Sequence, residues 1–581
     1  MSPGYRYALP GGLLDAERST RISSFLRRAG LTLRRRSHRP HPASFAELRA
    51  AHDDDYLERL QHPGALTSVV GFAISDRAEQ ELLAVQREMT GGTLLATRLA
   101  RAWGGIAVNL GGGFHHAHRA RGAGFCILND VAVAIRAQRA QGFDRRILVV
   151  DLDLHDGDGT RSIFADDPSV HTFSIHNQNW DDRPAIEATV LALGPGIDDA
   201  HYLAALSGAL PALFDRFLPE LVIYLCGADP ASDDALGDWR VSAAGMLARD
   251  RAVTDLVRHR RVPLVVTMAG GYGDNSWRYT ARYLSWLLSG IVLEPPTTEE
   301  LILDRFRDLV HEFSVGELRG TAAEEPLLTE ADLGGGLGLA SPETRLLGFY
   351  SLSGLELALE RLGHLARLRE LGYESPEVEL DLGAAGQTLR IFGARGRRDL
   401  VLEMRMRRDR RTIPGEELLA VDWLLLQNPR GRFSPARPAL PGQKFPGLGM
   451  LRETMAAVML ICDRLHLSGI IVTPSHFHAV VQARSQMRFL DPRSEGLFRV
   501  FQKALAPLSL GEATRAASNG QLRDAATGEP VLWTPSPMVL PVSAALRQRL
   551  ESPDYERDAA QFENAASALR LADLSAERSR G

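Results

Sequence analysis

The chain has 581 residues, which exceeds one ordinary domain, so we expect two domains and a linker. Hydrophobic residues make up 45% and charged residues 24% of the sequence, as in soluble globular proteins, and the net charge of −5 indicates no nucleic-acid partner. No apolar run is long enough to span a bilayer and the three cysteines are widely spaced, so we expect a cytoplasmic protein with no membrane partner, disulfide framework or cysteine zinc site.

The first half alternates short apolar runs with helical stretches such as 132–142 and 202–217. The apolar runs, most of which end in glycine, aspartate or histidine, are 105–113, 146–155, 170–175, 221–229 and 263–271. This order predicts an α/β domain with a parallel sheet covered by helices on both faces. Ligands bind such sheets at the carboxyl ends of the strands.

The second half has a different order. One helix, around residues 301–318, is expected in a connector, and an α+β domain follows. Its expected elements are a helix at 352–371, strands at 388–393, 399–407 and 418–427, a Gly/Pro-rich loop, and then helix, strand and helix. The polar, Ala-rich tail is expected to be helical or frayed. The predicted boundaries are 1–293, 294–345 for the connector, 346–548, and 549–581 for the tail.

Acidic and imidazole groups alternate along one predicted strand. Asp151, Asp153 and His155 share one of its faces, where unpaired burial would be very costly. Asp229 ends another strand. Two carboxylates and one imidazole suit zinc and leave an open coordination position, as in catalytic sites. The alternative is that these residues form a solvated turn after a strand. That alternative does not explain why Asp151, Asp153 and His155 recur at every second position on one face.

Two adjacent histidines follow the first predicted strand. His115 and His116 lie in a glycine-rich loop, and each needs an acceptor to fix its tautomer, for which Asp151 and Asp158 are available. Tyr272 follows two glycines after another strand and could donate a hydrogen bond to an oxyanion. The alternatives are structural histidines and a packing tyrosine.

Several sequence blocks occur in order across residues 40–290. They include LRAAHDDDYLERL, GGGFHHAH, GFCILNDVAVAI, VVDLDLHDGDGT, HTFSIHN, CGADPASDDALG and MAGGYG. Together they resemble a histone deacetylase-like amidohydrolase of the arginase/deacetylase fold, closest to the class IV branch and its bacterial relatives. The resemblance implies a hydrolase that removes an acyl group from acetyl-lysine or a small acetylated amine, with zinc, or alternatively iron(II), as its cofactor.

The resemblance also implies a role for each matching residue. His116 would deprotonate the attacking water and His115 would be its electrostatic partner or proton donor, supported by Asp158 and Asp151 respectively. Tyr272 would hold the oxyanion. The implied metal ligands are Asp153, His155 and Asp229.

The resemblance identifies only some of the residues that would surround the substrate. Gly124 and Phe125 would line an acyl-lysine channel, and Asp151 with Ser174 would form a potassium site. The segments 5–21 and 177–193 match the family pattern loosely, so one pocket edge and the substrate rim are not predicted. The oligomeric state is not indicated.

The two-metal arginase branch is the competing interpretation. It needs further carboxylates two residues after His155 and two residues after Asp229. Those positions are Gly157 and Ala231, which cannot bind a metal through their side chains. The sequence therefore favours one metal.

The second half offers a weaker motif. Gln443, Gly447 and Gly449 precede a predicted helix, where backbone N–H groups could bind a phosphate. The element order resembles an N-acetyltransferase, which would imply acetyl-CoA, but Gln443 and Gly447 are one residue too far apart for that family's loop. The alternative is a glycine-rich turn in an accessory domain. A bifunctional acetyl-handling protein and a non-catalytic acyl-lysine reader are therefore alternatives to a simple deacetylase.

Overall fold

The computed structural model describes residues 5, 15–31, 37–72, 74–320, 344–383, 386–394, 396–434, 438–484, 486–506, 508–565 and 569–571. The chain forms two compact units, Met1–Thr298 and Glu299–Gly581. Parts of the predicted connector (321–343) and tail (566–568 and 572–581) lie outside the described residues. Across the described residues, no helix has the length and apolar character that a membrane span requires.

The first unit is built on a six-stranded sheet with the order β1-β6-β5-β2-β3-β4. All neighbouring strands are parallel, which confirms the predicted α/β class. The strands are β1 (Ile106–Val108), β2 (Ile147–Asp151), β3 (Val170–His176), β4 (Ala188–Ala192), β5 (Leu221–Leu225) and β6 (Leu264–Thr267). Every residue of β2, β3, β5 and β6 is buried, as expected for a parallel sheet covered on both faces.

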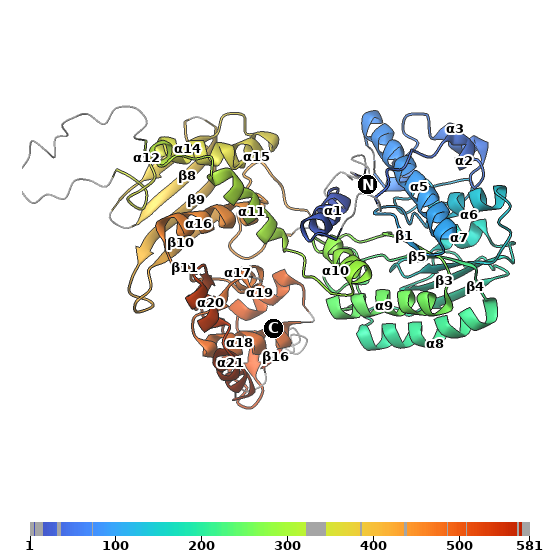
Figure 1. Cartoon of the computed structure of the whole chain (residues 1–581). Helices are drawn as coiled ribbons and strands as arrows, with labels where there is room; N and C mark the ends of the chain where they lie inside the picture. The colour runs from blue at the N-terminus through green and yellow to red at the C-terminus, as the bar shows by residue number, and fades with distance from the viewer. Residues whose placement is uncertain are drawn as a thin grey trace, which may run out of the picture. The chain divides into compact units, whose positions relative to one another are not determined.

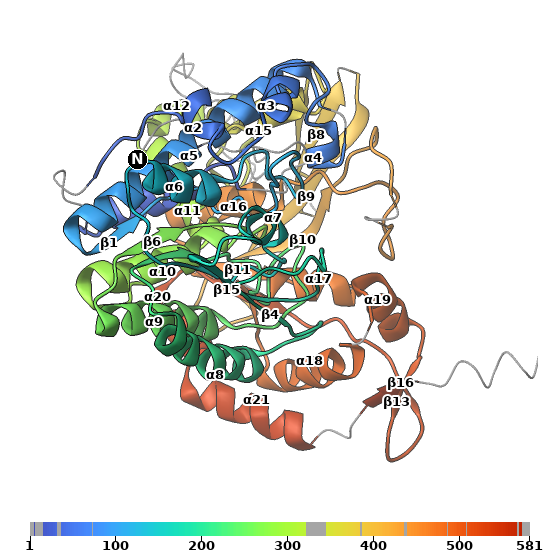
Figure 2. The ribbon, with the colours of Figure 1, turned by 90° about the vertical axis from the view of Figure 1, so that its right-hand side faces the viewer.

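Helices cover both faces of this sheet. They are α1 (Arg18–Arg28), α2 (Phe45–Leu48), α3 (Asp54–Arg59), α4 (Thr67–Val70), α5 (Asp76–Trp103), α6 (Asp130–Ala140), α7 (Asp158–Ile163), α8 (Asp199–Phe217), α9 (Ala243–Arg260) and α10 (Ser276–Ser289). Helices α8 and α9 lie side by side on one face, and α5 and α6 lie on the other (Figure 1, Figure 2). Helices α5, α6, α8 and α9 start where Ser75, Asn129, Asp198 and Ser242, respectively, accept a backbone N–H bond.

The strand order determines which loops meet. Because all strands are parallel, their carboxyl ends lie along one edge, and β6, β5 and β2 are consecutive there with β1 beside β6. The loops after these four strands carry the predicted site residues. Segments more than 100 residues apart in sequence therefore meet at that edge.

The second unit contains a seven-stranded sheet with the order β12-β15-β11-β10-β9-β8-β7 and a three-stranded sheet with the order β14-β13-β16. Within the described residues of this sheet, only β10 and β11 pair in parallel, and the other neighbouring strands are antiparallel. This mixed sheet with its helices confirms the predicted α+β class. The strands are β7 (Glu377–Asp381), β8 (Gln387–Ala394), β9 (Arg398–Asp409), β10 (Leu418–Leu426), β11 (Gly469–Val472), β12 (Arg488–Phe489), β13 (Leu522–Asp524), β14 (Pro530–Val531), β15 (Met538–Pro541) and β16 (Leu569–Leu571).

Two single helices predicted here are each divided in the structure. The expected helix at 301–318 is α11 and α12, because Ser314 starts a new helix through a capping box with Glu317. The expected helix at 352–371 is α14 and α15, which are separated by Gly363 in a left-handed conformation. The helices of this unit are α11 (Thr298–Val310), α12 (Val315–Arg319), α14 (Leu352–Arg361), α15 (His364–Glu370), α16 (Leu451–Leu465), α17 (Phe477–Ala483), α18 (Pro492–Leu505), α19 (Leu510–Ser518), α20 (Ala544–Leu550) and α21 (Pro553–Ala565).

The glycine-rich loop lies between β10 and α16. The side chain of Gln443 accepts a hydrogen bond from the N–H of Leu440 at 3.1 Å, which closes a local turn. Gly447 forms an isolated bridge with Gln427, and Gly449 is left-handed one residue before the N-cap of α16. Phosphate binding by this loop stays a prediction.

Candidate active site

The two adjacent histidines lie in the loop after β1. Asp130, the first residue of α6, anchors this loop by accepting hydrogen bonds from the N–H groups of Gly113 (2.9 Å) and Phe114 (2.7 Å). His115 and His116 are buried, and their rings lie 4.1 Å apart between centroids. Asp130 gives no distinct signal in the sequence, because an acidic residue in the first turn of a helix is ordinary.

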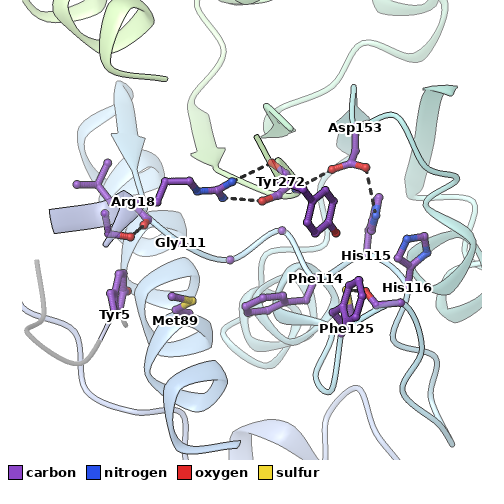
Figure 3. A pocket seen from close by; sticks show the side chains of 18 of the residues that line it. Tyr5, Arg18, Met89, Gly111, Phe114, His115, His116, Phe125, Asp153 and Tyr272 are labelled. Carbon is purple, nitrogen blue, oxygen red and sulfur yellow. Dashed lines mark hydrogen bonds and ion pairs between the residues drawn. The ribbon is translucent and has the colours of Figure 1, made fainter. Parts of the chain in front are cut away.

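Each histidine has its own carboxylate. Nδ1 of His115 lies 2.7 Å from Asp151, and Nδ1 of His116 lies 2.9 Å from Asp158. An ionised carboxylate only accepts, so each Nδ1 carries a hydrogen. Nε2 is therefore the ring nitrogen available to each histidine for proton transfer. Figure 3 shows both rings beside Asp153.

Helix α7 packs directly on the backbone of the histidine pair. The N–H of Thr160 donates to the carbonyl of His115 at 2.9 Å. A Cβ at Gly159 would lie 2.6 Å from the carbonyl oxygens of His115 and Ala117, so only glycine allows this approach. The start of α7 thus fixes where Asp158 stands relative to the histidines.

The metal-ligand candidates converge at the carboxyl edge. Ligand atoms of Asp153, His155 and Asp229 lie within 4.8 Å of one another, and no other such group of three occurs among the residues the structure describes. Nδ1 of His155 is 3.2 Å from Asp153 and 3.0 Å from Asp229. Main-chain N–H groups orient both carboxylates, from Gly270 to Asp153 at 2.7 Å and from Leu154 to Asp229 at 3.0 Å.

The charge of this cluster fits a divalent cation. Burial alone would lower the pKa of His155, but hydrogen bonds to Asp153 and Asp229 outweigh it and raise the pKa to about 11. Burial, followed by the charge of Asp153, raises the pKa of Asp229 to about 7. Among the described residues, no arginine or lysine forms an ion pair with Asp153 or Asp229, so a bound cation could take the place of the proton on His155. Carboxylate oxygen and imidazole nitrogen are donors that zinc and iron(II) accept.

The two histidines of the pair differ in proton affinity. Burial lowers the pKa of His115, but the charges of Asp151 and Asp153 outweigh it and raise the pKa to about 10. Burial and then the positive charge of His115 lower the pKa of His116 to about 4, against the effect of Asp158. Near neutral pH, His115 thus holds a proton that His116 lacks.

Aromatic rings border the approach to the cluster. The ring of Phe125 lies 6.0 Å from that of Tyr272, and Trp180 stacks on His116 at 4.1 Å with an interplanar angle of 8°. A Cβ at Gly124 would lie 2.4 Å from the ring of His116, which requires glycine there. Trp180 was missed because its loop, 177–193, matches the family pattern loosely.

The pocket continues past the cluster toward the start of the chain. Away from the histidines it is lined by Tyr5, Arg18 and Met89 (Figure 3), and Ser19 and Leu110 also belong to the lining. The Arg18 guanidinium donates to the carbonyls of Ala269 at 2.6 Å and Gly270 at 2.9 Å. Sequence reasoning missed Arg18, since an arginine in an amphipathic helix normally faces solvent and its partners lie about 250 residues away.

The predicted potassium residues are neighbours in the sheet. Asp151 and Ser174 are register partners in β2 and β3 and line one small cavity with Gly157. The Ser174 hydroxyl lies 2.7 Å from Nδ1 of His176. Cation binding there stays a prediction.

Comparisons with known proteins match the first unit to histone deacetylases. The histone deacetylase domain model matches residues 13–288. Histone deacetylase 2 of Arabidopsis thaliana is 32% identical over 279 residues, which cover 46% of this chain and 71% of that protein. An uncharacterized protein of Picosynechococcus is 38% identical over 232 residues, covering 38% of this chain and 77% of that protein. Human histone deacetylase 1 is 27% identical and is covered to 59%.

Among solved structures, a crystal structure of a histone deacetylase homolog from Aquifex aeolicus aligns with 25% identity and a TM-score of 0.43 over 49% of this chain and 81% of that one. The parallel six-stranded sheet of the first unit has the arginase/deacetylase arrangement. On the evidence of the matching domain and of the Arabidopsis relative, the chain belongs to the histone deacetylase family of amidohydrolases.

Proposed function

We propose that the first unit hydrolyses the acyl-amide bond of N-acetyl-lysine in proteins, or of a small acetylated amine, with one zinc or iron(II) ion as cofactor. The observation that carries the proposal is the convergence of Asp153, His155 and Asp229 next to two histidines, each with its own carboxylate. A divalent cation held by these three residues would supply the positive charge that activates water and polarises the amide carbonyl.

His116 is the residue suited to accept the proton of the attacking water. Its lowered pKa of about 4 leaves the ring unprotonated at neutral pH. Because Asp158 holds its Nδ1–H, the lone pair is on Nε2. General base catalysis of this kind contributes about 10²–10⁴-fold.

His115 has the complementary property. Its raised pKa of about 10 keeps a proton on the ring, and Asp151 orients it from Nδ1 at 2.7 Å. We assign His115 the electrostatic role beside the base and the donation of a proton to the leaving amine. The pair therefore divides acid and base work between two adjacent side chains.

Tyr272 is assigned to the developing oxyanion. Burial, together with the charges of Asp229 and Asp153, raises the pKa of its phenol well above the usual value, so the hydroxyl keeps its hydrogen. Asp234 fixes the loop by accepting the N–H of Tyr272 at 2.6 Å and that of Gly273 at 3.2 Å. One preorganised donor of this kind typically contributes about 3–4 kcal/mol.

The two ends of the pocket suit an acylated aliphatic amine. The rings of Phe125 and Trp180 offer apolar faces to a methylene chain near the cluster. At the other end of the pocket, Arg18 is bonded to main-chain carbonyls, so its charge remains available to attract an anion such as the acetate product.

The test is hydrolysis of acetyl-lysine peptides, longer-acyl peptides and acetylpolyamines by the full chain, with and without a chelator. We expect turnover of at least one acetyl substrate, its loss in chelator, and a His116→Ala variant that binds but does not hydrolyse. Binding without turnover by the unmodified chain would instead support an acyl-lysine reader. Full activity of His116→Ala would show that the assigned base is wrong.

A second candidate is a bifunctional acetyl-handling protein with an acetyl-CoA site in the second unit. One observation favours it. Strands β10 and β11 pair in parallel only over Leu418–Val421. Strand β10 then continues to Leu426 beside β9, whereas β11 ends at Val472. The glycine-rich loop and the start of α16 follow the end of β10, and a helix N-terminus favours phosphate. Calorimetric titration of the full chain with acetyl-CoA tests it, and absence of binding would contradict it.

A further inference from the structure

A third histidine lies behind the proposed base. His118 is two residues after His116 and is 7% exposed. Its Nε2 lies 3.0 Å from Oδ2 of Asp158, while His116 holds Oδ1 of the same carboxylate at 2.9 Å. Asp158 is therefore bonded to two imidazoles, one beside the metal cluster and one on the far side.

Helix α7 and the loop backbone fix His118 in this place. Its Nδ1 lies 2.9 Å from the hydroxyl of Ser162, one helical turn after Asp158, so the ring spans one turn of α7. The backbone N–H of His118 donates to the carbonyl of Arg121 at 2.8 Å. Its own carbonyl accepts Nδ1–H of the buried His52 at 3.0 Å. These contacts leave the ring little freedom to move.

The hydrogen positions follow from the partners. A carboxylate only accepts, so a bond to Asp158 requires a hydrogen on Nε2 of His118. The guanidinium of Arg121 lies 2.9 Å from the same Nε2, but it only donates. The nitrogen cannot bond to both, and the form with a hydrogen on Nε2 is the one that serves Asp158. Ser162 can then donate to Nδ1 or accept from it.

We propose that His118 is a positioning residue for the hydrolysis proposed above, which it serves by holding Asp158 in the orientation that fixes the tautomer of His116. With only His116 bonded to it, the carboxylate of Asp158 could rotate and move its Oδ1 away from Nδ1 of His116. With His118 on Oδ2, both oxygens are held and the plane of the carboxylate is set. Burial would raise the pKa of Asp158, but the hydrogen bonds from His116 and His118 outweigh it and keep the pKa well below its usual range.

The proposal predicts an effect on turnover rather than on substrate binding. His118 lies behind the base and is not among the residues that line the pocket. His118→Leu removes the donor, and we expect kcat to fall about 10–100-fold with KM nearly unchanged, the size seen for partners that orient catalytic groups. His118→Gln keeps an amide donor at the position of Nε2, and we expect it to restore most of kcat. His201→Leu, at an exposed histidine, is the matched control.

The outcomes separate this proposal from the proposed function. Inactive wild-type protein, or a fully active His116→Ala, would refute the function itself. If wild type is active and His116→Ala is not, then unchanged kcat in His118→Leu, or equal losses in the Leu and Gln variants, would overturn the positioning role. If thermal melting shows that His118→Leu does not fold, His118→Asn, whose shorter amide falls short of Asp158, replaces it in the same comparison.

Discussion

The two units are each built on a β-sheet but place their polar groups differently. In the first unit all six strands are parallel, so the loops after β1, β2, β5 and β6 meet at one edge and bring acids and histidines together. In the second unit most neighbours are antiparallel, and successive strand ends alternate between opposite edges. There, charged side chains such as Arg390 pair across strands with Glu379 and Glu403. Strand direction, rather than composition, decides where a reactive cluster can form.

Buried acids show the same contrast. Asp153 and Asp229 are 1% and 0% exposed and share one histidine, and no arginine of the described residues forms an ion pair with either. Glu495 in the second unit is also 0% exposed, but Arg484 and Arg499 pair with it. A buried carboxylate with a permanent cation is a structural element, whereas a pair that lacks one is suited to an exchangeable ion.

The contrast between the two units predicts the largest difference when one buried acid of each unit is replaced by its neutral amide. In Asp229→Asn we expect bound metal to be lost and kcat/KM to fall more than about 10³-fold, because the cation supplies several kcal/mol of transition-state stabilisation. Glu495→Gln should keep full activity and bound metal while lowering the free energy of unfolding. Metal analysis and peptide hydrolysis measure both, and equal effects of the two variants on activity would contradict the account.

A smaller loss is expected from the proposed oxyanion donor. Tyr272→Phe removes one hydroxyl and should lower kcat about 10²–10³-fold with little change in KM. Tyr373→Phe in the second unit, which loses a 2.7 Å bond to Asn428, is the matched control and should keep the wild-type rate. Steady-state kinetics on one acetyl-lysine peptide measures both variants. A kcat of Tyr272→Phe within a factor of two of the wild-type value would show that Tyr272 has no role in the mechanism.

Both units should lose folding stability at acid pH, because each contains a buried histidine with a lowered pKa. Burial lowers the pKa of His52 in the first unit and of His364 in the second to about 4. The native state then binds fewer protons than the unfolded state between about pH 6.5 and pH 4, so stability is full above that window and falls as the pH drops through it. Each histidine accounts for about 3 kcal/mol.

Denaturant unfolding at several pH values tests this, with His52→Gln as the variant that cannot titrate. The Gln variant should lose less stability than wild type between about pH 7 and pH 4. Identical pH dependence in the two proteins would mean that His52 does not contribute to the acid sensitivity.

The smallest expected effect is at the tryptophan that stacks on the proposed base. Trp180→Ala removes the ring stacked on His116 and should raise KM for an acetyl-lysine peptide several-fold, as for the loss of about 1 kcal/mol of aromatic contact. Trp423→Ala, at an exposed tryptophan of β10, is the control. An unchanged KM in Trp180→Ala would place the substrate chain elsewhere.

The sequence predicted the parallel sheet and the residues at its carboxyl edge, because strand periodicity is local and parallel strands share one edge. It did not predict Arg18 or Trp180, because their positions depend on loops and on main-chain carbonyls distant in sequence. The division of α14 from α15 at Gly363 and the extra strand β7 were also missed, since their signals are short. The asymmetry between His115 and His116 required the positions of their carboxylates.

The most direct test of the central claim is to titrate metal-free full-length protein with zinc while following bound metal and the rate of acetyl-peptide hydrolysis together. We expect both to rise in parallel and to saturate at one ion per chain, with neither rising in Asp229→Asn. Saturation at two ions, or a rate independent of added metal, would contradict a single-metal hydrolase at the carboxyl edge of the first sheet.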